Sequence, residues 1–192
     1  MSKYMKGFRN SLNTDGPGKH DLDVNIKKER HANKLLNEGS LNDAEIIYRE
    51  LIAEKYSTAQ IYSALASICG MTDRRDEMTE LLHLALKINP NLIEANNNLG
   101  IALKSEGKLE ESIKYYEKAI SLSKPNCYIY NNLGNALKGL RRLDEAIEAF
   151  HKALDIDSNF AEANYNLGNT LLEKNEASLA KLSIEKALKI NP

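Results

Sequence analysis

The sequence predicts an all-α solenoid, in which about ten antiparallel helices form five stacked helical hairpins. A short motif returns at equal intervals along the chain: Asn-Asn-Leu-Gly at 97–100 and 131–134, and Tyr-Asn-Leu-Gly at 165–168. Within each interval, apolar residues follow the three-and-four spacing of helices, and Gly- or Pro-containing segments separate them. A fixed period of this kind is typical of solenoids, which act through a long surface more often than through a pocket.

Residues 93–126 illustrate one unit. Leu99, Ala102 and Leu103 give the apolar stripe of a first helix, which Gly107 ends. A second stripe runs over 109–120, and Pro125 prevents that helix from continuing. Neither helix can bury its apolar face alone, so neighbouring units must stack.

Small residues recur at fixed places in the unit. Gly100, Gly134 and Gly168 share a position in the first helix, and an Ala recurs at 119, 153 and 187 in the second. A mid-helix Gly costs about 1 kcal/mol relative to Ala. Its recurrence therefore predicts a close helix contact that tolerates no side chain.

The pattern resembles the tetratricopeptide repeat (TPR). Leu133-Gly134, Ala146, Phe150 and Ala153 match its signature well, and residues 93–126 and 161–192 match it with single departures. Weaker matches precede them around Leu65-Ala66 and His31-Ala32. We therefore expect five repeats, at about 25–58, 59–92, 93–126, 127–160 and 161–192. The resemblance implies a right-handed superhelix whose first helices line a concave, ligand-binding groove.

The two ends raise separate expectations. Residues 1–24 lack periodicity and contain several helix breakers, which predicts a disordered leader. The array ends at Pro192 without a C-terminal capping helix, so one stacking face is expected to be uncovered. The chain is then a fragment of a longer protein, or it self-associates through the uncapped C-terminal repeat.

Composition narrows the class of protein. The chain has 26 Lys and Arg against 27 Asp and Glu, a net charge of −1, which argues against nucleic-acid or membrane partners. No stretch approaches the ~20 apolar residues of a membrane span, and no signal peptide is recognisable. Cys69 and Cys127 follow no metal or redox spacing. We expect a cytoplasmic protein with reduced thiols.

The sequence offers no constellation for catalysis. It has no Gly-rich phosphate loop and no His-Glu-x-x-His motif. Of the four histidines, His20 falls in the leader, His83 and His151 on solvated faces, and His31 is expected to be partly buried and hydrogen-bonded. These features predict a protein that is not an enzyme, with no metal and no cofactor.

The first helices carry the candidate site. With the register of TPR arrays, the groove residues would be Asn97, Asn98, Ile101, Lys104, Tyr128, Asn131, Asn132, Asn135, Lys138, Tyr165, Asn166 and Asn169. Among them Asn98, Asn132 and Asn166 form a ladder with one rung per repeat. An Asn side chain both accepts and donates hydrogen bonds, so a row of them can hold the main chain of an extended peptide. The ladder is similar to that in the TPR arrays of O-linked N-acetylglucosamine transferases; repeat duplication alone would also produce it.

Other TPR binding modes fit less well. The carboxylate clamp of chaperone adaptors needs a Lys at a place that here holds Glu29, Ser63, Asn97, Asn131 and Tyr165 in turn. RNA binding would need a basic face with stacking residues, and only Tyr128 and Tyr165 offer stacking. We therefore predict a scaffold that binds an extended peptide or a partner helix. The alternative is the N-terminal, substrate-presenting region of a larger glycosyl-, sulfo- or methyltransferase.

Overall fold

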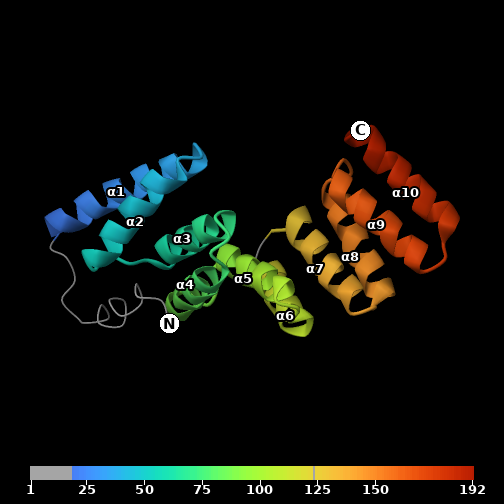
Figure 1. The fold of residues 1–192 in the computed structure, drawn as a ribbon, viewed down its shortest axis with the longest axis horizontal. Coiled ribbons are helices and arrows are strands. Elements are labelled where there is room, and N and C mark those ends of the chain that lie inside the picture. Colours follow the sequence, from blue (N-terminus) through green and yellow to red (C-terminus); the bar gives the residue numbers. More distant parts are fainter. Residues whose placement is uncertain (1–18, 123) are drawn as a thin grey trace. The chain divides into compact units, whose positions relative to one another are not determined.

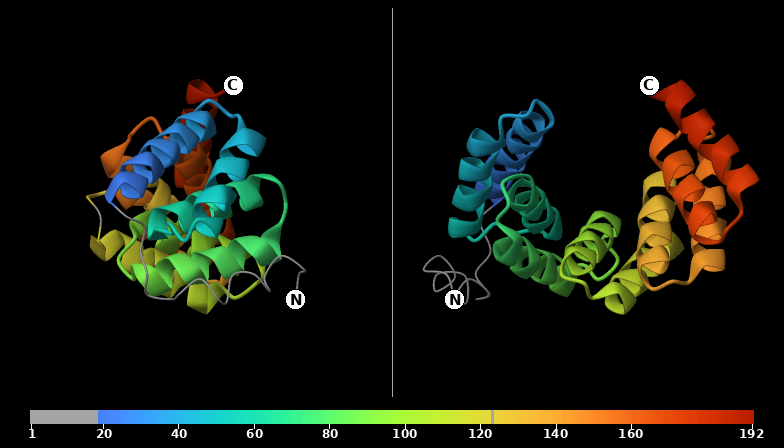
Figure 2. Two further views of the ribbon diagram at one scale, coloured as in Figure 1. Left: turned by 90° about the vertical axis from the view of Figure 1, so that its left-hand side faces the viewer. Right: turned by 45° about the vertical axis from the view of Figure 1, so that its right-hand side comes forward.

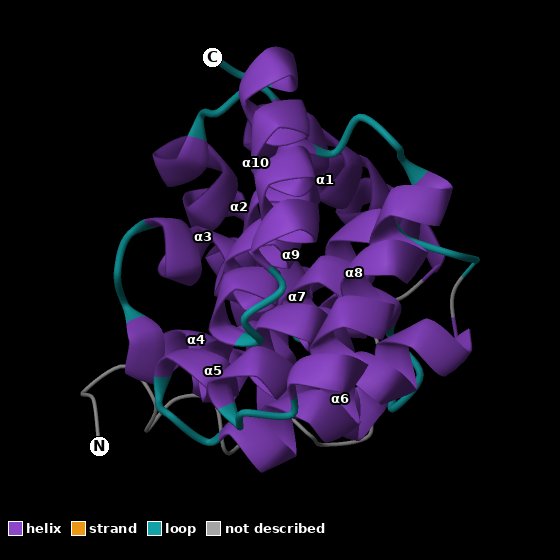
Figure 3. Ribbon diagram, turned by 90° about the vertical axis from the view of Figure 1, so that its right-hand side faces the viewer, coloured by secondary structure: helices purple, strands orange, loops and turns teal. Residues whose placement is uncertain are grey.

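A computed structural model describes residues 19–122 and 124–192, and each element in these ranges is a helix (Figures 1 and 3). The all-α solenoid class predicted from the period is confirmed. The helices are α1 (Lys19–Asn37), α2 (Leu41–Ala53), α3 (Ala59–Met71), α4 (Arg75–Ile88), α5 (Ile93–Ser105), α6 (Leu109–Leu122), α7 (Cys127–Gly139), α8 (Leu143–Ile156), α9 (Ala161–Glu173) and α10 (Ala177–Ile190).

Consecutive helices pair as antiparallel hairpins, as α9 and α10 show clearly in Figure 2. We number them hairpin 1 (α1 and α2) to hairpin 5 (α9 and α10). The chain divides into two units: unit 1, residues 1–89, contains hairpins 1 and 2, and unit 2, residues 90–192, contains hairpins 3 to 5.

The turn inside every hairpin uses one left-handed residue. These residues have φ between +57° and +81° and recur once per repeat, at Gly39, Asp73, Gly107, Arg141 and Asn175. In hairpin 3, the N–H of Lys108 bonds to the carbonyl of Leu103 at 2.9 Å, closing the turn as a Schellman motif. The equivalent bond is present in the other four turns. The backbone period therefore extends through hairpins 1 and 2, where the sequence motif is weak.

The recurring glycines lie against a large side chain of the second helix. A Cβ added to Gly100 would approach Cε1 of Tyr116 to 2.6 Å, and one added to Gly134 would approach Cε1 of Phe150 to 2.6 Å. At Gly168 the neighbour is Ile184 Cγ1, at 2.5 Å. The predicted close contact is confirmed, and it joins the backbone of each first helix to a side chain of the helix that follows it.

Unit 2 has one continuous apolar core over its three hairpins. Tyr116 and Phe150 are fully buried in it, together with Ile113 of α6 and Leu167 of α9. Burial of large apolar side chains is the main stabilising contribution in such a stack. The first helices α5, α7 and α9 are therefore held side by side by the helices packed behind them.

The contact between hairpins 1 and 2 is partly ionic. Glu45 of α2 bonds to Arg74 at 2.6 Å and to Arg49 at 2.6 Å, and Glu77 of α4 contacts both arginines. The hydrogen bond from Arg74, with a further contribution from Arg49, lowers the pKa of Glu45 below its usual value. Glu45 occupies the register position of Ile113, so the same place in the hairpin is ionic in hairpin 1 and apolar in hairpin 3.

Some sequence-based expectations need correction. Helix α1 begins at Lys19, so residues 19–24, predicted to be disordered, are helical; residues 1–18 of the predicted leader, and the side chain of His20, lie outside the described part of the chain. His31 is exposed, contrary to the expectation that it would be partly buried and hydrogen-bonded. His83 and His151 are exposed as predicted.

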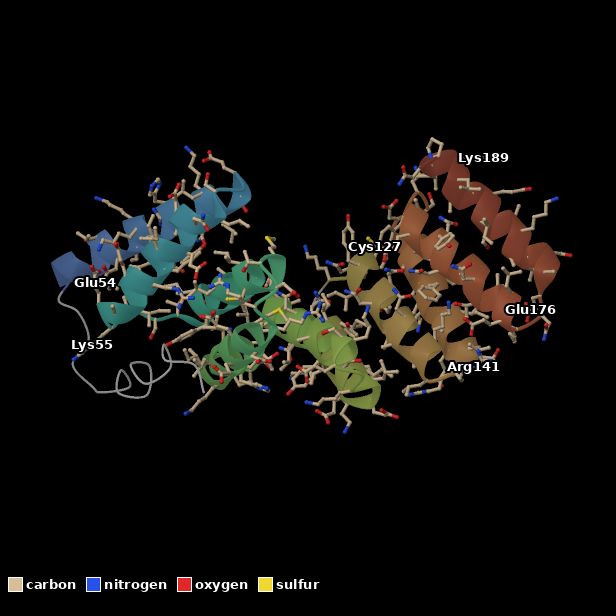
Figure 4. The ribbon with its side chains drawn as sticks, in the orientation of Figure 1. Glu54, Lys55, Cys127, Arg141, Glu176 and Lys189 are labelled. Atoms are coloured by element: carbon tan, nitrogen blue, oxygen red, sulfur yellow. The ribbon has the colours of Figure 1, made fainter. Side chains whose placement is uncertain are left out.

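Both cysteines are buried free thiols. Cys69 lies inside unit 1, where burial and, secondarily, the charge of Glu77 raise its pKa to about 12. Cys127, labelled in Figure 4, is the first residue of α7. It packs near Ala153 and Ala163. A thiol with a raised pKa is a poor nucleophile at neutral pH, so Cys69 has a packing role.

Candidate functional site

Three asparagines, one on each first helix of unit 2, mark the candidate site. Asn98 of α5, Asn132 of α7 and Asn166 of α9 are all half-buried. We call the surface formed by these residues and their neighbours on α5, α7 and α9 the amide face. Figure 4 labels Cys127 and Arg141, which bracket α7, the central helix of this face.

The amide groups are bonded across neighbouring helices. Asn132 donates from Nδ2 to Oδ1 of Asn97 on α5, at 3.2 Å. Asn97 in turn donates from Nδ2 to Oδ1 of Asn98, at 3.3 Å. Asn132, the central rung of the ladder, is thus held by Asn97, the residue that precedes the rung Asn98 on α5.

The next pair repeats this arrangement and shows which way the amides point. Asn131 donates to Oε1 of Glu162 at 2.9 Å, and Asn166 donates to Oδ1 of Asn131 at 3.0 Å. An ionised carboxylate only accepts hydrogen bonds, so Glu162 fixes the Asn131 amide with its N–H groups toward α9. Asn166 must then donate to Asn131, and its own Oδ1 lies on the opposite edge of its amide plane.

Asn131 is not on the exposed surface, where a direct ligand contact would lie. Only 2% of its surface is exposed, because α9 covers it. Its bonds to Glu162 and Asn166 show that it holds a neighbouring rung in place. Sequence alone does not distinguish Asn131 from Asn132, since both fall on the same side of the helix.

The other predicted residues differ in their availability. Tyr128 and Tyr165 are exposed, and the Tyr128 ring packs edge-on against Phe160 with centroids 5.0 Å apart. Lys138 pairs with Glu173 of α9 at 3.1 Å. The remaining members are the half-buried Lys104, Asn135 and Asn169 and the exposed Ile101.

Two further asparagines of the same helices are structural, and the sequence reasoning missed them. Asn96 and Asn164 are both 2% exposed. Asn96 donates to the carbonyl of Leu92 at 2.8 Å, and Asn164 donates to that of Phe160 at 3.1 Å. These bonds tie the first turn of each helix to the residue before it. The two asparagines are separated by two repeat lengths, and this spacing is the signal that would have identified them.

Other kinds of site are not evident in the part of the chain that the structure describes. It holds no group of three His, Cys, Asp or Glu side chains placed to bind a metal ion. Among its helices, none combines the length and apolar character needed to span a membrane. On α10, Leu179, Leu182 and Leu188 are exposed. Self-association through this last hairpin stays a prediction.

Comparison with known proteins identifies the repeat. Models of the tetratricopeptide repeat match residues 127–160 and 161–192, and a TPR repeat model matches residues 102–140. Residues 102–192 of this chain are tetratricopeptide repeats. The matches cover hairpins 4 and 5 and most of hairpin 3, the part of the chain where the sequence motif is strongest.

Solved structures of TPR proteins share the fold. MamA from Desulfovibrio magneticus RS-1, residues 41 to the end, is 19% identical, with 88% of this chain and 95% of that chain covered and a TM-score of 0.77. PilF of Pseudomonas aeruginosa is 19% identical, covers 91% and 79%, and has a TM-score of 0.79. YrrB, described as a TPR protein with an unusual peptide-binding site, is 23% identical, covers 87% and 86%, and has a TM-score of 0.72.

Proposed function

We propose that this chain is a protein-interaction scaffold without catalytic activity, and that its amide face binds an extended peptide. The observation that carries the proposal is the set of oriented amides on α5, α7 and α9. The tetratricopeptide repeats of residues 102–192 support an interaction role. The similar fold of YrrB, described as a TPR protein with an unusual peptide-binding site, supports a peptide as the ligand.

The hydrogen bonds inside the face leave capacity for a ligand. An Asn amide has two N–H hydrogens and an oxygen with two lone pairs. Asn132 and Asn166 each use one N–H on the preceding helix. Each then offers its oxygen and a second N–H, the two groups that a peptide main chain can satisfy.

The fixed orientation favours main-chain binding. The Nδ2 group of Asn132 donates to Asn97, and that of Asn166 donates to Asn131. The Oδ1 atoms of Asn132 and Asn166 are therefore directed away from these bonds. A preorganised acceptor loses little conformational entropy when a ligand binds. We therefore infer that the rungs accept hydrogen bonds from peptide N–H groups, and that the exposed Tyr128 and Tyr165 pack against peptide side chains.

The test is a peptide selection with three forms of the chain. Peptides of about a dozen residues, displayed on phage, are selected on the wild type and then synthesised. Each hydrogen bond contributes about 0.5–1.5 kcal/mol. The combined change Asn98→Ala, Asn132→Ala and Asn166→Ala is therefore expected to weaken binding of the selected peptides at least about tenfold, the factor that ~1.4 kcal/mol represents.

A matched control alters one register position on the second helices. Glu117→Ala, His151→Ala and Glu185→Ala change exposed residues that are likewise one repeat apart, and binding should stay as in the wild type. Unfolding curves of both triple variants show whether loss of the bonds to Asn97 and Asn131 has disturbed the fold. N-methylation of the peptide N–H groups should also abolish binding. Equal affinity of the wild type and a folded ladder variant would refute the proposal.

A further inference from the structure

One position on the first helices changes chemistry between hairpins. Asn33 of hairpin 1 is followed at the same place in the next four repeats by Ser67, Ile101, Asn135 and Asn169. Four of the five residues are polar, and the exception is in hairpin 3. Ile101 is 38% exposed and lies on the amide face, one helical turn beyond Asn97 and Asn98.

Ile101 leaves a buried hydroxyl without a partner. In hairpin 1, Tyr48 donates its hydroxyl to Oδ1 of Asn33 at 2.6 Å, which joins the two helices. Tyr116 stands at the equivalent place in hairpin 3 and is fully buried against Gly100. The residue at the place of Asn33 is Ile101, which has no acceptor, and the Tyr116 hydroxyl has no hydrogen-bond partner in the described structure.

The apolar residue at this position leaves out a hydrogen bond that an Asn there could make with Tyr116. A buried polar group without a partner is destabilising, and native structures contain few of them. Places where a sequence breaks such a local rule are often functional. Ile101 keeps 38% of its surface exposed, so its apolar side chain is available for contact with a ligand on the amide face.

We propose that Ile101 is a specificity-determining residue of the amide face, and that the bound peptide places an apolar side chain against it. This inference rests on the proposed peptide-binding function and names the chemistry of the ligand. Successive side chains of an extended peptide point to opposite sides. A main chain held by Asn98 and Asn132 can therefore direct one side chain toward Ile101, which lies one helical turn from Asn98 on α5.

The test uses the same displayed peptide library with the wild type, Ile101→Asn and the ladder triple variant. The wild type is expected to select peptides with an aliphatic or aromatic residue at one fixed position. Replacing that residue by Ala in a synthetic peptide should weaken binding to the wild type about tenfold, equivalent to ~1.4 kcal/mol. The same replacement should have less than about a twofold effect on binding to Ile101→Asn, which cannot make the apolar contact.

The outcomes separate the two proposals. We call a peptide ladder-dependent when the ladder triple variant binds it more weakly than the wild type does. Replacing the apolar residue of such a peptide by Ala could weaken its binding equally to the wild type and to Ile101→Asn. This result would overturn the role of Ile101 and leave the peptide-binding proposal intact. Ladder-dependent peptides without any apolar preference would have the same meaning. Failure of the wild type to select any ladder-dependent peptide would overturn both. Ile101→Asn supplies an acceptor for Tyr116, so this variant is expected to fold, and circular dichroism checks that it does.

Discussion

The unpaired hydroxyl of Tyr116 gives a prediction that needs no ligand. The changes are Ile101→Asn and Tyr116→Phe, made singly and together in the full chain. The first supplies the acceptor that Asn33 provides to Tyr48 in hairpin 1, where the two oxygens are 2.6 Å apart. The second removes the hydroxyl that has no partner. If the register comparison is correct, the two changes interact.

The magnitude follows from the surroundings of each residue. A net hydrogen bond contributes about 0.5–1.5 kcal/mol, and an unsatisfied buried donor costs about 1–3 kcal/mol. Tyr116→Phe should therefore stabilise the chain by about 1 kcal/mol. Ile101 is 38% exposed, so its replacement costs on the order of 1 kcal/mol of apolar contact. In the wild type this cost and the new bond nearly cancel, whereas in the Tyr116→Phe background only the cost remains.

The assay is urea unfolding followed by circular dichroism, with the four free energies of unfolding combined as a double-mutant cycle. We expect a coupling of about 1–2 kcal/mol between the two positions. Hairpin 1 offers the mirror experiment: Asn33→Ile should destabilise the chain by about 1–3 kcal/mol more when Tyr48 is present than when Tyr48→Phe has removed the hydroxyl. Additivity in the Ile101 and Tyr116 cycle would refute the assignment of Ile101 as the residue that leaves the hydroxyl unpaired.

Three other predictions concern the scaffold. Gly134→Ala should destabilise by roughly 1–3 kcal/mol, since its Cβ would lie 2.6 Å from an aromatic carbon; a rise in the thermal midpoint would contradict this packing. Lys55→Gly should stabilise the chain by about 1 kcal/mol, because Lys55 has the left-handed φ of +62° that Gly adopts without strain. The control Lys87→Gly, within helix α4, should destabilise the chain by about 1 kcal/mol. Equal effects of the two changes on the free energy of unfolding would disprove the strain at Lys55. The pKa of Glu45 is lowered by Arg74, so its stabilisation is present above the unfolded value of 4.5 and is lost as pH falls below it. Glu45→Gln should therefore be less stable than the wild type at neutral pH, and urea midpoints that keep this difference at about pH 3 would argue against the effect.

The fold is well predicted from the sequence because a solenoid repeats one local solution. The period, the glycines and the helix-ending residues are all local signals, and the structure confirms the helices and the close contacts of Gly100 and Gly134. The start of α1 was missed because residues 19–24 carry no repeat motif. The exposure of His31 was missed because a weak repeat match does not fix how deeply each residue is buried.

The candidate site was predicted less completely, because amides that look alike in sequence have different surroundings. Asn96, Asn97 and Asn98 are consecutive, yet Asn96 donates to Leu92 just before the helix, Asn97 accepts from Asn132 of α7, and Asn98 accepts from Asn97. Periodicity locates such residues on one helix. It does not distinguish an amide that bonds inward from one that lies at the surface, since that depends on the helix beside it.

The structure also changes how the ladder is interpreted. A periodic Asn can be a product of repeat duplication, and the bonds from Asn132 to Asn97 and from Asn166 to Asn131 give it a structural role as well. The two roles are compatible because each bond uses only one of the hydrogens of an amide. Under the proposed peptide-binding function, the bond that connects adjacent hairpins also holds the amide oxygen in one direction as an acceptor for the peptide. Repeat duplication explains why Asn recurs at one position of each repeat. It does not explain why Asn131 is buried and donates to Glu162, which leaves the Asn131 oxygen to accept from Asn166.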